Sequence, residues 1–114
     1  TMLAAGIGNI HGKYPANWAG LSFETLAAVQ EKTGEMPLVL HGGSGISDDD
    51  FRRCAQHGMA KINVFTDLCL AGEKAMKEGI EKNLGYLETR NLKVKYMKEA
   101  VKAKMLVFGS QNKA

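Results

Sequence analysis

Two histidines in this sequence stand in the same local setting, and that setting suits the binding of a metal ion. His11 and His41 each follow an apolar run, each precedes a glycine, and they lie thirty residues apart. A glycine lets the backbone turn sharply while the imidazole before it stays at the end of a strand. Zinc binds imidazole nitrogens at about 2.0–2.1 Å. The pair is therefore predicted to bind zinc; the alternative is that each is an ordinary hydrogen-bonded residue at a strand end.

The glycine-rich segment directly after His41 has the composition of a phosphate-binding loop. It runs Gly42-Gly43-Ser44-Gly45 and leads into a helix predicted to begin near Ser47. Glycines allow backbone N–H groups to converge on an anion, and a helix N-terminus adds partial positive charge. The segment matches neither the dinucleotide-binding pattern nor the Walker A pattern. We predict a phosphate site here, with a simple tight turn as the alternative.

A third polar set, Asn63 and Thr66, follows the next apolar run. Its position after the glycine-rich loop favours a role in holding the same phosphorylated ligand. Thr66 also has the residue type of a helix N-cap, so both roles are expected of it. His57 differs from the other histidines, because it falls at the predicted C-terminal end of a helix, where it interacts with the helix dipole.

The elements that must position these residues alternate between strand and helix. Apolar runs without alternation are typical of parallel strands covered on both faces. The predicted order is strand 2–10, helix 22–34, strand 37–41, helix 47–58, strand 60–65, helix 66–84 and helix 92–105. This order predicts an α/β fold of about three βα units plus a terminal helix, and its spacing fits part of a (β/α)8 barrel. The C-terminal ends of parallel strands share one edge, so the three polar sets are expected at one mouth.

Composition excludes several classes of protein. The chain has 114 residues and a formal net charge of +3, with no internal linker or repeat, so residues 1–114 are predicted to form a single segment. No apolar run reaches the about 20 residues of a membrane helix. A lysine-rich run within 93–104 has helical spacing and is predicted to be a solvated helix face, not a nucleic-acid site. Cys54 and Cys69 are predicted to be reduced, as in a cytoplasmic protein.

Four segments together resemble the class II, zinc-dependent fructose-bisphosphate/tagatose-bisphosphate aldolase family. They are GIGNIHGKY, PLVLHGGSGI, AKINVFTDL and the terminal FGSQNKA. The resemblance covers nearly the whole chain and corresponds to the C-terminal portion of the family's (β/α)8 barrel. It implies reversible aldol cleavage of a ketose phosphate to glycerone phosphate and an aldehyde. Zinc would polarise the ketone carbonyl and stabilise the enediolate.

The resemblance also assigns roles to individual residues. His11 and His41 match two of the family's three histidine ligands for Zn²⁺. Asn63 matches the asparagine that contacts the glycerone phosphate moiety. The phosphate-binding positions correspond to Gly12, Gly42, Gly43, Ser44 and Thr66, and a monovalent cation near that site is also implied.

The sequence departs from the family's pattern at several points. It has no counterpart of the third histidine ligand or of the catalytic aspartate, which lie in the first half of the barrel. Pro15 replaces a lysine that binds phosphate in some members, and Lys13 is the nearest substitute. Phe65 stands where some members of the family have an aspartate near the phosphate, which leaves the choice of ketose open.

Two functions from different classes follow. The first is a class II aldolase segment that has little activity until the missing N-terminal half is supplied. The alternative is a non-catalytic metal- or phosphate-binding α/β module that self-associates, and a structural fragment of a degenerate relative is a third possibility. The expected partners are a phosphorylated sugar and either a second copy of the chain or the missing half-barrel, without nucleic acid or membrane.

Overall fold

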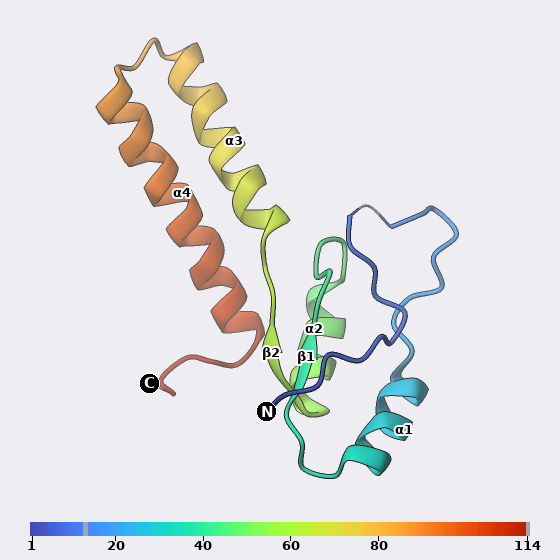
Figure 1. Ribbon diagram of the computed structural model, residues 1–114. Helices are drawn as coiled ribbons and strands as arrows, with labels where there is room; N and C mark the ends of the chain where they lie inside the picture. The colour runs from blue at the N-terminus through green and yellow to red at the C-terminus, as the bar shows by residue number, and fades with distance from the viewer. Residues whose placement is uncertain (13, 114) are drawn as a thin grey trace. The chain divides into compact units, whose positions relative to one another are not determined.

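The computed structural model describes residues 1–12 and 14–113 (Figure 1). The described residues form α1 (Phe23–Thr33), β1 (Leu38–Leu40), α2 (Asp48–Gln56), β2 (Met59–Ile62), α3 (Thr66–Glu81) and α4 (Tyr86–Val107). Strands and helices alternate as expected of an α/β chain. Contacts divide the chain into two compact units, one made of residues 1–64 with 107–109, the other of residues 65–106 and those from 110 onward.

The sheet of the first unit has two parallel strands, β1 and β2, with Leu40 paired to Ile62. The other edge of β1 is met by the N-terminal segment, where Leu3 forms an isolated parallel bridge with Leu38. The amide of Leu3 donates to the carbonyl of Pro37 at 3.0 Å, and Val39 donates back to Leu3 at 2.9 Å. Three passes of the chain therefore run parallel, as predicted.

The prediction of a strand over residues 2–10 is wrong beyond that single bridge. Gly8 has a φ of 93°, which lies outside the strand region. The backbone N–H of Ile7 donates to Asn9 Oδ1 at 2.8 Å. This N–H is therefore used in a local hydrogen bond and not in pairing with a neighbouring strand. Ile7 is completely buried in the core, whereas Ile10 is 41% exposed. The segment therefore packs on the core through the side chain of Ile7 and not as a continuous strand.

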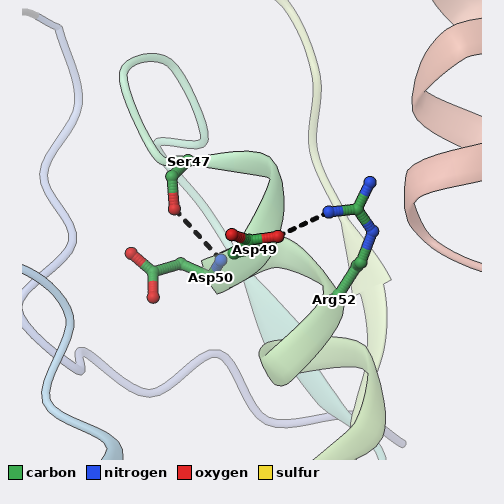
Figure 2. Close-up of polar contacts among 4 residues, drawn as sticks. All are labelled: Ser47, Asp49, Asp50 and Arg52. Atoms are coloured by element: carbon green, nitrogen blue, oxygen red, sulfur yellow. Dashed lines mark hydrogen bonds and ion pairs between the residues drawn. The ribbon is translucent and has the colours of Figure 1, made fainter.

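The helices of the first unit begin at the predicted caps. Ser22 Oγ accepts the N–H of Thr25, and Gly34 ends α1 with a φ of 58°. Figure 2 shows the start of α2, where Ser47 Oγ accepts the N–H of Asp50 at 3.1 Å. Satisfying a free N–H in this way stabilises a helix by about 1 kcal/mol.

The core of the first unit lies where α1, α2 and the strands meet. The completely or almost completely buried side chains are Ile7, Leu26, Leu38, Leu40, Phe51 and Cys54. Phe51 packs edge-on against Phe108, with ring centroids 5.3 Å apart. Burial, and then the negative charge of Asp50, raise the pKa of the Cys54 thiol to about 11, so this cysteine is a protonated apolar core residue.

Phe51→Ala is expected to destabilise the first unit by about 3–5 kcal/mol, because it removes a large buried ring and leaves a cavity. The ring also supports the glycine-rich loop: a Cβ built on Gly43 would lie 3.1 Å from Phe51 Cζ. Urea unfolding followed by the fluorescence of Trp18, the single tryptophan, measures the change. Phe65→Ala is the control, since that side chain is 77% exposed and its loss should change stability by less than about 0.5 kcal/mol. Equal losses in both variants would contradict the assignment of Phe51 to the core.

The second unit contains α3 and α4, whose side chains meet along their length. Lys93 and Met97 of α4 approach Gly72, and Thr89 approaches Gly79. At the other end Lys104 lies 3.3 Å from Asp67. These contacts make the helices antiparallel neighbours. No residue of α4 is buried, and Lys95, Lys98 and Lys102 are exposed as predicted, whereas Lys104 is only partly exposed. Apolar side chains between these lysines, such as Val94 and Val101, are exposed too.

Two boundaries and one capping role in this part of the chain differ from the prediction. Strand β2 ends at Ile62, three residues early, because Phe65 already serves as the N-cap of α3. Thr66 is the first helical residue and makes no capping hydrogen bond with its side chain, so its predicted capping role is wrong. Helix α4 begins six residues earlier than expected, where the carboxylate of Glu88 accepts the N–H of Gly85 at 3.0 Å.

Among the residues that the structure describes, no helix is both long and apolar enough to span a membrane.

Candidate functional site

The two predicted metal ligands lie close together in the first unit. The ring centroids of His11 and His41 are 5.6 Å apart, and the ring planes are inclined by 53°. His41 follows the end of β1 and is partly buried, whereas His11 lies on the N-terminal segment and is exposed. The proximity predicted from the two strand ends is therefore present, although the segment that carries His11 is not a regular strand.

Hydrogen bonds from the N-terminal segment to the backbone after β1 hold the two histidines together. Asn9 Nδ2 donates to the carbonyl of His41 at 2.9 Å, and the Tyr14 hydroxyl donates to the carbonyl of Gly42 at 2.8 Å. Gly42 has a φ of 65°, and a Cβ there would lie 2.0 Å from the carbonyl oxygen of Ile10. Only glycine permits this approach of two backbones.

Asn63 joins the site from the end of β2. Its backbone N–H donates to the carbonyl of Leu40 at 3.0 Å, which continues the pairing of the two strands. Its side-chain Nδ2 lies 2.7 Å from Nδ1 of His41. Lys61 Nζ in turn donates to Asn63 Oδ1 at 2.5 Å. The predicted substrate-binding asparagine and the predicted ligand histidine are thus in direct contact.

The glycine-rich loop packs against the same group of residues. Gly43 is buried, and a Cβ on it would lie 3.2 Å from the carbonyl oxygen of Asn63. Ser44 is partly buried, and Gly45 has a φ of 89° beside the ring of Tyr14. The backbone of this loop therefore lies between the histidine pair and the N-terminus of α2.

The first turn of α2 holds negative charge of its own. Its acidic residues are Asp48, Asp49 and Asp50. Arg52 lies 2.6 Å from Asp49, and Arg53 lies 3.5 Å from Asp50. An anion in front of this helix would meet carboxylates as well as the positive end of the dipole. The loop, more than the helix, is the part suited to a phosphate group.

Gly12 directly follows His11, whereas His57 lies at the end of α2. Gly12 has a φ of 95° and no neighbour within 4 Å of a built Cβ, so it is open to a ligand. Thr66 belongs to the second unit, and Lys13 lies outside the described residues. His57 is the C-cap of α2, as predicted, with its ring centroid 6.4 Å from that of Phe23. Within residues 1–12 and 14–113, no three His, Cys, Asp or Glu side chains converge as a metal site would require.

Sequence reasoning missed Asn9 and Tyr14, which tie the two backbone segments of the site together. Both stand within three residues of His11, in a segment interpreted as a strand and a turn. A signal was present in Asn9 itself, because asparagine inside an apolar run disfavours a strand and favours local hydrogen bonds.

Comparison with known proteins gives consistent matches. The family model "Fructose-bisphosphate aldolase class-II" matches residues 1–113. A fructose-bisphosphate aldolase of Mycoplasma pneumoniae is 43% identical, over 98% of this chain and 42% of its own length. One of Streptococcus pyogenes is 40% identical over the same shares. The crystal structure of the YdjI aldolase from Escherichia coli K12 superposes with a TM-score of 0.85 at 39% identity, over 99% of this chain and 39% of that one. The chain thus spans about two fifths of the length of these relatives.

Proposed function

Because the chain belongs to the class II fructose-bisphosphate aldolase family, we propose that it is the C-terminal part of a zinc-dependent aldolase. The reaction is reversible cleavage of a ketose phosphate to glycerone phosphate and an aldehyde. The observation that supports this most directly is the approach of the His11 and His41 rings to 5.6 Å. Asn63, in contact with His41, adds a polar group for the substrate at the same place.

The histidine pair fits one zinc ion. Two imidazoles bound to the same tetrahedral zinc hold their ring centroids about 5 Å apart, close to the separation found here. When bound, zinc supplies a Lewis acid that polarises the ketone carbonyl of the substrate. A catalytic zinc needs three protein ligands and an open position. We assign the third ligand and the catalytic base to the remaining part of the barrel.

The phosphate group of the substrate is assigned to the loop after His41. Gly42, Gly43 and Ser44 directly follow His41 and would offer backbone N–H groups and a hydroxyl to the phosphate, and a Cβ built on Gly12 meets no atom within 4 Å. Asn63 is assigned to the glycerone phosphate moiety, with a monovalent cation nearby, and Thr66 of the second unit keeps only the role that the family resemblance gives it. In this arrangement the chain's residues bind and orient the substrate, while proton transfer belongs to residues outside it.

The segment as a whole is proposed to contribute three parallel passes and their helices to a (β/α)8 barrel. Residues 1–114 would then act as one segment of a cytoplasmic enzyme, in keeping with two free cysteines. The partner is either the preceding half-barrel or a second copy of the chain.

An aldol cleavage assay on two proteins tests this function. The 114-residue chain with zinc should turn over fructose or tagatose 1,6-bisphosphate at least about a thousandfold more slowly than a complete aldolase, because it lacks the base. A chimera in which the chain replaces the matching 42% of the Mycoplasma pneumoniae relative should be active. The same chimera with His41→Ala is the matched control. Rapid cleavage by the chain alone would contradict the incompleteness of the site, and a folded but inactive chimera would contradict the aldolase function.

A self-associating metal- or phosphate-binding module is the second candidate, favoured by the apolar side chains exposed on α3. Met76 is 51% exposed and Ile80 is 78% exposed. Light scattering and zinc content separate the two candidates: a zinc-loaded dimer of the chain together with an inactive chimera would favour the module.

A further inference from the structure

The side chains of Lys61, Asn63 and His41 are linked in series by hydrogen bonds. The Lys61 ammonium group donates to Asn63 Oδ1 at 2.5 Å, and Asn63 Nδ2 lies 2.7 Å from His41 Nδ1 and 3.4 Å from Nε2. Lys61 and Asn63 are two residues apart along an extended segment, so their side chains project from the same face. All three residues belong to the first unit.

The lysine removes an ambiguity that an amide side chain otherwise has. An asparagine amide offers an acceptor at one end and donors at the other, and either end fits against an imidazole. An ammonium group only donates, so Lys61 binds the oxygen end. The NH2 end of Asn63 must then face His41. This orientation predicts that Nδ1 of His41 accepts and that a neutral ring carries its proton on Nε2.

We propose that Lys61 is a positioning residue of this site, which fixes the Asn63 amide so that its N–H donor faces His41. This donor is hydrogen-bonded to His41 Nδ1. If a metal ion bound that nitrogen, the Asn63 amide would be displaced and its N–H would be free for a new acceptor. The last step rests on the proposed function: the acceptor is then an oxygen of the phosphorylated ketose, and the fixed amide selects oxygen acceptors over donor groups at that position.

Lys61 has the exposure of an ordinary surface lysine, and an ordinary lysine would have no effect on the imidazole. The two interpretations differ in one measurable property, the position of the proton on the neutral ring of His41. This property does not depend on zinc, on substrate or on turnover.

The test is ¹⁵N NMR of the imidazole nitrogens in the full 114-residue chain without metal, near pH 8, where imidazole is generally neutral. In the parent chain, Nδ1 of His41 should have the shift of an acceptor and Nε2 that of an N–H. Lys61→Met should raise the ratio of the Nδ1–H form to the Nε2–H form at least about threefold, as expected for loss of one charge-assisted hydrogen bond at an exposed lysine. Lys61→Arg should restore the parent ratio, because arginine also only donates.

Two further variants keep the outcome unambiguous. Asn63→Asp places an acceptor against His41 and should move the proton to Nδ1. Lys77→Met, which removes a lysine paired with Glu73 on α3, should change nothing at His41. An unchanged ratio in Lys61→Met, or a proton on Nδ1 in the parent chain, overturns the proposal even if zinc binds. The expected shifts without zinc binding would leave the positioning role standing and remove the metal assignment instead.

Discussion

Gly42→Ala is expected to lower the free energy of unfolding of the first unit by about 2–5 kcal/mol. A residue with a Cβ loses about 1–2 kcal/mol in the left-handed region, where the φ of Gly42 lies at 65°. The new Cβ would also stand 2.0 Å from the carbonyl oxygen of Ile10 and 2.6 Å from its carbonyl carbon. These are backbone atoms, so no side-chain rotation relieves the contact, and overpacking of this kind costs a further about 1–3 kcal/mol.

The measurement is urea unfolding followed by Trp18 fluorescence, with Gly109→Ala as the matched control. Gly109 has nearly the same φ, 68°, but no atom within 4 Å of a built Cβ. Gly109→Ala therefore measures the cost of a left-handed φ alone, without the contact between the new Cβ and neighbouring backbone atoms. Gly42→Ala should also weaken zinc binding, because separating the two backbones moves His11 away from His41. Equal destabilisation by the two variants would mean that the approach of Ile10 to Gly42 contributes nothing.

Loss of either histidine of the pair is expected to weaken zinc binding by at least about a hundredfold. Removal of groups that merely orient a ligand already costs about 10–100-fold in metal affinity, and His11 and His41 are proposed as ligands themselves. The variants His11→Ala and His41→Ala are compared with the parent by competition with a zinc-binding dye.

The third histidine provides the control for this experiment. His57 lies at the C-terminus of α2 beside Phe23, so His57→Ala should leave the zinc affinity unchanged within about twofold. A comparable loss in all three variants would indicate nonspecific binding by imidazoles, and no loss in the first two would exclude them as ligands.

The elements set by local residue chemistry were predictable from sequence. Helices α1 and α2 begin where Ser22 and Ser47 stand, because a serine hydroxyl accepts a free N–H of the first turn. Strand β1 lies inside the uninterrupted apolar run before His41. The approach of His11 to His41 followed from the parallel order of the segments that precede them.

The sequence-based predictions fail where a side chain or a segment distant in sequence determines the course of the backbone. The strand expected over residues 2–10 is lost because Asn9 captures the N–H of Ile7. The true start of α4 depends on Glu88 folding back onto Gly85, a pair that apolar periodicity does not register. The bond of Tyr14 to Gly42 joins residues twenty-eight positions apart, and nothing local to either predicts it.

The bonds from Asn9 and Tyr14 end on main-chain carbonyls, not on side chains. Every residue type supplies such a carbonyl, so the hydrogen bonds that join these two backbone segments are insensitive to which side chain occupies position 41. Substitutions there alter which ion or group is bound while the loops keep their course. Chemical selectivity and architecture are thus encoded separately in this short stretch, which allows ligand preference to diverge among relatives without a new fold.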